Sequence, residues 1–247
     1  MNRLLVWDLP VRLFHWVFAG SFLASFAVAS LVDDDARAFT LHMWLGGLMV
    51  FALLLRLLWG VVGSRHARLA AFPLRPGALV AYLRDAFRGG GQRFVGHNPG
   101  SAWAVVAMFT FAMGLGATGL MMASGGEVVE ELHEIFAWAM VATVGAHLAG
   151  IAWHTLRHRE NIALSMIDGR KRVDAAEAIG VAHPVVGVAF LALVGLWGGA
   201  LLQGYDPVNQ QVRLPVLGTT LQLGEGGEGE GGEGGGGDDD EDDEDRD

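Results

Sequence analysis

Five long apolar runs separated by polar segments dominate the pattern of this chain. They cover roughly residues 13–31, 41–62, 101–123, 132–156 and 181–202. A helix needs about 20 apolar residues to cross a bilayer, and it satisfies its own backbone hydrogen bonds in lipid. The pattern therefore predicts an all-α integral membrane protein with five transmembrane helices.

The longest polar segment, residues 64–100, contains two further structural signals. The stretch A-L-V-A-Y-L-R-D-A-F-R before three consecutive glycines predicts a short amphipathic helix that lies on the membrane surface. In G-H-N-P-G-S, Asn98 is expected to cap the third long helix, with Pro99 in its first turn.

Lys and Arg residues are concentrated in alternate polar segments. Two precede the first apolar run, six lie between the second and third runs, and five lie between the fourth and fifth, which makes 13 of 17. These three segments lie on one side if every run crosses the membrane. Because basic loops remain in the cytoplasm, we expect a multi-pass protein of the bacterial cytoplasmic (inner) membrane. Its N-terminus would be cytoplasmic and its C-terminal tail extracytoplasmic.

The net charge of −10 comes from the end of the chain. Residues 225–247 contain 13 acids and one base, or −12, so the remainder carries +2. A Gly/acidic segment of this kind cannot bury a core, and we expect it to be disordered. It would either solubilise the protein or dock a basic soluble partner. The chain has no cysteine, which excludes disulfides, thiolate catalysis, Cys-ligated iron–sulfur clusters and covalently attached haem.

Five of the nine histidines lie within the predicted spans, where an ionisable side chain is a functional hypothesis by default. They are His15, His42, His133, His147 and His154. His133 and His147 are 14 residues apart, so they share one helix face and differ in height by about 21 Å.

The predicted topology places four of these histidines at two matched depths. His15 lies at the inner end of the first span, and His147 lies deep in the fourth. His42 and His133 both lie near the outer surface. Two stacked pairs of imidazoles in a four-helix bundle suit two bis-His haems. We therefore expect His15, His42, His133 and His147 to be axial ligands of haem iron.

Several alternatives remain open. His154 follows His147 by seven residues on the same face, so it could replace His147 as the inner ligand, or bind a haem propionate or a quinone. Arg56 lies 14 residues after His42, near the inner level, and would pair with a propionate or extend its charge to the interface. Arg12 is similarly placed beside His15. The remaining four histidines are expected to be solvated (His66, His97 and His158) or structural (His183).

Four motifs resemble a known family. They are V-W-D-L-P-V-R-L-F-H-W at the start, R-L-L-W-G-V-V-G-S-R-H-A-R after the second run, G-H-N-P-G before the third, and H-R-E-N-I-A-L-S-M-I-D-G-R-K-R after the fourth. Together they cover about residues 1–173. The chain resembles the bacterial di-haem cytochromes of the cytochrome b561 and Ni,Fe-hydrogenase b-type cytochrome subunit group, which are related to the formate dehydrogenase membrane subunit.

The resemblance implies four core helices that bind two non-covalent b haems through histidines on helices 1, 2 and 4. His15, His42, His133 and His147 match that pattern. Members of the group pass electrons between a quinone pool and a partner redox protein, such as a c-type cytochrome or a dehydrogenase or hydrogenase subunit. No nucleic acid is expected as a partner.

The predicted organisation is a di-haem four-helix domain over residues 1–173, an additional transmembrane helix over 174–205, and an extracytoplasmic segment over 206–247. The expected role is electron transfer within a quinone-linked oxidoreductase. One alternative is a membrane ion or metal transporter that uses histidines, which would also be expected to place acidic residues within its spans. Another is a non-redox membrane anchor of an enzyme complex, which would not require four histidines at two depths.

Overall fold

The computed structural model describes residues 2–32, 39–88, 90, 93–206, 211–213, 215, 218 and 220–222. The acidic tail, residues 225–247, lies outside the described residues. Five helical segments are long and apolar enough to cross a membrane: Leu9–Leu31, Thr40–Val62, Pro99–Met122, Gly125–His158 and Pro184–Gln203. The predicted all-α membrane architecture with five spans is therefore confirmed.

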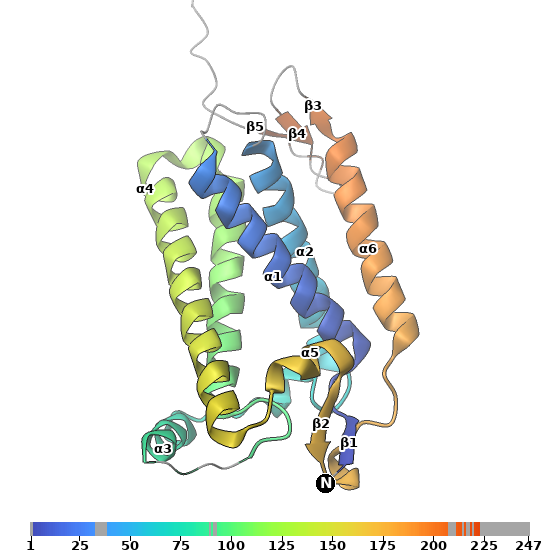
Figure 1. The fold of residues 1–247 in the computed structure, drawn as a ribbon. Helices are drawn as coiled ribbons and strands as arrows, with labels where there is room; N and C mark the ends of the chain where they lie inside the picture. Colours follow the sequence, from blue (N-terminus) through green and yellow to red (C-terminus); the bar gives the residue numbers. More distant parts are fainter. Residues whose placement is uncertain are drawn as a thin grey trace, which may run out of the picture.

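The third and fourth spans form a hairpin. They belong to α4 (Pro99–His158), which is interrupted at Gly126, where φ is 60° and ψ is −166°. Only glycine adopts this conformation readily. Figure 1 shows the two arms of α4 side by side, joined at the end opposite the N-terminus.

The second arm of α4 begins earlier than the sequence pattern predicts. Three exposed glutamates that precede the predicted run of residues 132–156 lie in the first turns of this arm: Glu127, Glu130 and Glu131. Glutamate is a good helix former, and its charge is favourable near the positive N-terminal end of a helix. An apolar-run criterion misses these turns because the residues are charged.

Side-chain caps fix the starts of two spanning helices. At the start of α1 (Leu9–Leu31), the carboxylate of Asp8 accepts a hydrogen bond from the Val11 backbone N–H at 2.9 Å. Asn98 accepts from the Ser101 N–H at 2.8 Å, with Pro99 as the first residue of α4. The predicted Asn98 cap is confirmed.

The short elements cluster at the two ends of the bundle (Figure 1). At the N-terminal end, β1 (Asn2–Leu5) pairs antiparallel with β2 (Arg170–Val173) beside α5 (Ser165–Asp168), and α3 (Pro76–Phe87) lies at the same end against α4. Three 3₁₀ turns also belong to these connections: Leu69–Ala71, Ile162–Leu164 and Ala175–Glu177. At the other end, β3 (Tyr205–Asp206), β4 (Gln211–Arg213) and β5 (Thr220–Gln222) form an antiparallel sheet. The amphipathic helix predicted in residues 64–100 is α3.

The additional helix α6 (Pro184–Gln203) packs against α1 and α2 (Phe39–Val62). The indole N–H of Trp44 donates to the Gly198 carbonyl at 2.9 Å, and that of Trp197 donates to the Gly47 carbonyl at 3.3 Å. The rings of Phe51 and Trp197 stack at 4.7 Å. These contacts make α6 part of the same bundle.

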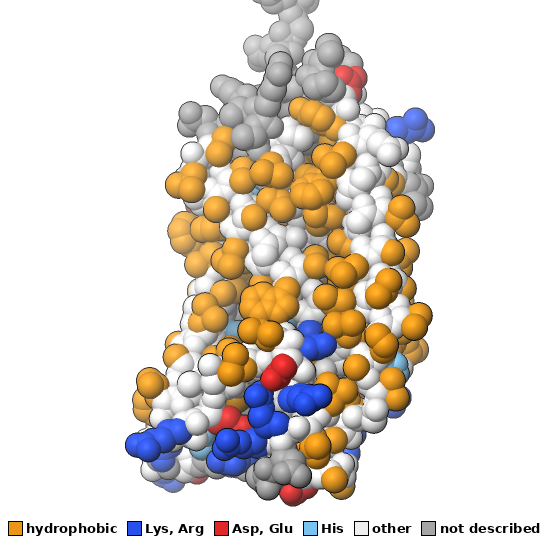
Figure 2. Space-filling model, turned by 45° about the vertical axis from the view of Figure 1, so that its right-hand side comes forward, with side chains coloured by type: hydrophobic (Ala, Val, Ile, Leu, Met, Phe, Trp, Pro, Cys, Tyr) orange, Lys and Arg blue, Asp and Glu red, His pale blue; other side chains and the backbone are white. Residues whose placement is uncertain are grey.

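The surface separates into an apolar band and one basic end. Apolar side chains cover the length of the bundle in Figure 2, whereas Lys and Arg side chains gather at the end that holds the N-terminus. This end, here called the basic end, is formed by the N-terminal segment and by the loops after α2 and α4. The sequence prediction that these three segments lie on one side is confirmed.

Candidate haem sites

At the end of the bundle opposite the basic end, His42 of α2 faces His133 of the second α4 arm. Their ring centroids are 6.2 Å apart and the ring planes are inclined by 67°. Two imidazoles bound to one metal through bonds of about 2 Å place their bonding nitrogens about 4 Å apart and their ring centres somewhat further apart. The structure therefore brings the predicted outer pair to a separation that fits one metal between the rings.

The hydrogen bonds of His42 identify the nitrogen that carries its proton. Nδ1 lies 2.9 Å from the Ser25 carbonyl oxygen and 2.9 Å from Ser25 Oγ. A carbonyl only accepts, so Nδ1 carries the proton and donates it. The Ser25 hydroxyl in turn donates to the His42 carbonyl at 3.1 Å. A metal bond at His42 therefore falls to Nε2.

The same reasoning applies to His133. Its Nδ1 lies 2.8 Å from Thr118 Oγ1, and that hydroxyl also lies 2.8 Å from the Gly114 carbonyl. The single hydroxyl proton goes to the carbonyl, which can only accept, so Oγ1 accepts from Nδ1–H. Metal-binding histidines commonly donate their other ring N–H in this way. Both outer imidazoles thus have the tautomer that ligation through Nε2 requires.

The predicted inner pair, His15 of α1 and His147 of α4, lines one pocket toward the basic end. The Nδ1 atom of His15 is buried and makes no hydrogen bond within the described part of the chain. A buried polar atom without a partner costs about 1–3 kcal/mol, so this wall of the pocket suits a further polar or metal-bearing group.

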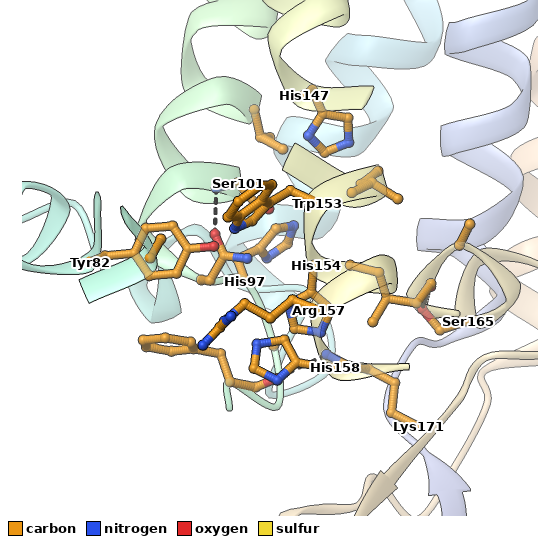
Figure 3. Close-up of a pocket in the computed structure, with 18 of the residues that line it drawn as sticks. Tyr82, His97, Ser101, His147, Trp153, His154, Arg157, His158, Ser165 and Lys171 are labelled. Carbon is orange, nitrogen blue, oxygen red and sulfur yellow. Dashed lines mark hydrogen bonds between the residues drawn. The ribbon is translucent and has the colours of Figure 1, made fainter. Parts of the chain in front are cut away.

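His154 lines the same pocket nearer to the basic end. Its ring packs at 4.5 Å from that of His158, in the last turn of α4. Figure 3 shows His147 separated from this pair, which lies beside Lys171. Both candidates for the inner ligand therefore line the pocket, at different depths.

Arg56 is buried within the bundle, with 3% of its surface exposed. Its Nη2 donates to the Ala67 carbonyl at 2.8 Å, and its guanidinium lies 5.9 Å from the centroid of the Phe14 ring. The alternative in which Arg56 extends to the interface is wrong, because the loop after α2 folds back over it. Its Nη1 is buried and has no hydrogen-bond partner among the described residues.

Arg12 resembles Arg56 in this respect. Its Nη1 donates to the Ile167 carbonyl at 2.6 Å, whereas its buried Nε has no partner in the described part of the chain. Each arginine thus retains one buried N–H group near the inner level. A carboxylate, such as a haem propionate, would satisfy either group.

The prediction that His97 is solvated is wrong. His97 is partly buried, with ring centroids 4.9 Å from Trp7 and 4.4 Å from Phe72. Burial, followed by the positive charges of Arg56 and Lys171, lowers the pKa of His97 to about 3, so the ring is neutral.

The other loop histidines also have structural contacts. His66 Nε2 lies 2.8 Å from the Glu177 carbonyl, and His158 packs on His154. His183 lies 5.2 Å from Trp59 at the start of α6, which agrees with the structural role predicted for it. The contacts of His66 and His97 come from segments distant in the sequence, which local reasoning could not include.

Sequence reasoning also missed Ser25, Thr118 and Lys171. The Lys171 ammonium donates to the carbonyls of Phe94 at 2.9 Å and Val95 at 2.7 Å, and its burial lowers its pKa. The only available signal for Ser25 and Thr118 was a hydroxyl within an apolar run.

Among the described residues, no group of three or more His, Cys, Asp or Glu side chains is arranged to hold a metal ion. The histidines come together as pairs instead. A bis-His haem requires two protein ligands, because the macrocycle supplies the other nitrogens. The arrangement of the outer pair thus fits a haem better than a metal ion bound by protein alone.

Comparison with known proteins agrees with this chemistry. Residues 6–169, more than half of the chain, match the family model described as prokaryotic cytochrome b561. A probable Ni/Fe-hydrogenase B-type cytochrome subunit of Rhizobium leguminosarum bv. viciae is 25% identical over 211 residues, covering 67% of this chain and 87% of the relative.

A second relative with the same description, from Bradyrhizobium diazoefficiens, is 23% identical over 210 residues, covering 68% of this chain and 85% of its own. No solved structure gives a significant match. The extent of the family match, over the four helices that position the histidines, shows that the chain belongs to the prokaryotic cytochrome b561 family of b-type cytochromes.

Proposed function

We propose that the protein is the membrane electron-transfer subunit of a quinone-linked oxidoreductase and holds two non-covalent b haems. His42 and His133 ligate the outer haem, and His15 and His147 ligate the inner one. The observation that carries this proposal is the facing pair His42 and His133, 6.2 Å apart, with both Nδ1 protons engaged by neighbouring oxygens.

The protein residues position the haems and exclude water. Each haem, when bound, supplies reversible one-electron chemistry. His133 and His147 are 14 positions apart, which separates the two levels by about 21 Å along α4. Arg12 and Arg56 have buried N–H groups with which to bind propionates at the inner level. The apolar side chains of α1, α2 and α4 form the low-dielectric interior between the levels.

The partners follow from topology and from the relatives. We infer that the basic end lies in the cytoplasm, because basic loops are retained there. The end that holds the outer pair would then face a redox protein outside. The names of the two relatives favour a hydrogenase subunit in that role. A different dehydrogenase subunit and a c-type cytochrome are the alternatives. Quinone in the surrounding lipid would exchange electrons with the haem chain.

The two other functions explain less of the geometry. A histidine-using transporter requires a polar route along the spans, whereas the residues between the two levels, including Leu53 and Met140, are buried and apolar. A non-redox anchor gives no reason for Ser25 and Thr118 to hold two facing imidazoles in one tautomer.

The pairing is tested by replacing the outer histidines one at a time. We expect His42→Ala and His133→Ala each to remove the same haem, because one iron requires both ligands, while the other haem keeps its reduced-minus-oxidised spectrum. His183→Ala, at the start of α6 and outside the pocket of the inner pair, serves as the control and should retain both haems. Loss of different haems from the two outer variants would refute the pairing.

A further inference from the structure

We infer that Ser25 and Thr118 are positioning residues that set the redox potential of the outer haem. They touch its ligands rather than the haem itself. This inference rests on the proposed function, in which His42 and His133 ligate one iron. It adds a specific tuning role for two hydroxyl residues within apolar helices.

The hydroxyl group of Thr118 both donates and accepts a hydrogen bond. It is 7% exposed, donates to the Gly114 carbonyl at 2.8 Å and accepts from His133 Nδ1 at 2.8 Å. Back-bonding of this type also occurs at Thr110, which donates to the Val106 carbonyl at 3.0 Å on the exposed side of the same arm. Back-bonding alone slightly destabilises a helix, so it does not explain a buried threonine. The contact with His133 does.

Ser25 presents two oxygens to one N–H group. Its carbonyl and its hydroxyl each lie 2.9 Å from His42 Nδ1. The carbonyl belongs to the backbone of α1 and survives any side-chain substitution. Removal of the Ser25 hydroxyl therefore weakens the bond to His42, whereas removal of the Thr118 hydroxyl abolishes the bond to His133.

These bonds have a defined electronic consequence. An oxygen that accepts the Nδ1 proton makes the opposite nitrogen more basic, so the imidazole becomes a better electron donor to iron. A more basic ligand favours ferric over ferrous haem and lowers the reduction potential. Loss of the acceptor should raise it. At the inner level, His15 Nδ1 has no hydrogen-bond partner in the described part of the chain, so the inner haem provides an internal reference.

The test is a potentiometric titration of the purified full-length protein, followed optically. Thr118→Val preserves the shape of the side chain and removes the hydrogen-bond acceptor. It should raise the reduction potential of the outer haem, by about 59 mV for each tenfold change in the equilibrium constant toward ferrous haem. Thr118→Ser restores the hydroxyl and should return the potential toward that of the wild type. Thr110→Val, the matched control, should change neither haem. Ser25→Ala should produce a smaller rise than Thr118→Val.

Loss of a supporting hydrogen bond typically costs 10–100-fold in metal affinity, so Thr118→Val could lose the outer haem. In that case the potential of Ser25→Ala decides, and an unchanged outer potential in that variant would overturn the inference. An unchanged potential, an equal shift of both haems, or a Thr118→Ser variant that behaves like Thr118→Val would overturn it. These outcomes presuppose two haems in the wild type. Failure to find the outer haem there would refute the proposed function instead.

Discussion

At the scale of single residues, the groups that surround each histidine distinguish the proposed haem ligands from the other histidines. His42 and His133 have hydroxyl and carbonyl oxygens at Nδ1, whereas His97 lies between the rings of Trp7 and Phe72. The sequence predicted that His42 and His133 form a pair, because both lie at the same depth in the predicted topology. Ser25 and Thr118 could not be identified in that way, because their contacts depend on the rotation of each helix about its axis.

The choice between His147 and His154 as the inner ligand is also a residue-scale prediction. His154 packs against His158 near the basic end, whereas His147 lies deeper in the bundle. We expect His147→Ala to abolish the inner haem. His154→Ala should retain it and at most shift its potential or impair quinone turnover. The reverse result in optical spectra would move the ligand to position 154.

At the scale of helices and strands, the sequence pattern predicted the secondary structure of each segment better than its tertiary contacts. The five apolar runs, the amphipathic α3 and the Asn98 cap depend on local sequence, and all three are present. The pairing of β1 with β2 joins segments about 170 residues apart and has no local signal. The early start of the second α4 arm was missed because charged helix formers resemble a loop in a hydropathy profile.

The docking of α6 provides an element-scale prediction. A Cβ atom at Gly198 would lie 3.0 Å from Leu48 Cδ2 and 3.2 Å from Trp44 Cζ2, whereas one at Gly199 would meet nothing within 4 Å. Gly198→Leu should therefore destabilise α6 packing by about 1–3 kcal/mol, the usual cost of overpacking. Gly199→Leu, with the same change in helix propensity, is the control. Unfolding in denaturing detergent measures the difference.

Both glycine variants should keep both haems, because α6 supplies none of the four proposed ligands. Equal stability of the two variants would show that α6 does not depend on this close approach.

At the scale of the whole molecule, the charge distribution distinguishes the two ends of the bundle. The basic end collects three segments that are far apart in the sequence, and an apolar band covers the helices between the ends (Figure 2). Sequence order alone predicted this arrangement, because an alternating topology leaves few choices. The packing of α6 on α1 and α2, rather than on α4, required the structure.

The absence of cysteine from the chain permits a direct test of orientation. Arg172 is exposed at the basic end, and Arg213 is exposed at the opposite end. In intact spheroplasts, a membrane-impermeant maleimide should label Arg213→Cys but should label Arg172→Cys only after permeabilisation. Labelling in the opposite order would invert the proposed topology.

The number of haems per chain tests the central claim most directly. Two matched histidine pairs in a chain without cysteine predict two b haems that acidified organic solvent extracts completely. Quantitative haem extraction from the purified protein, normalised to amino-acid analysis, should return two haems per chain. A value near one, or the absence of haem, would contradict the two-site account.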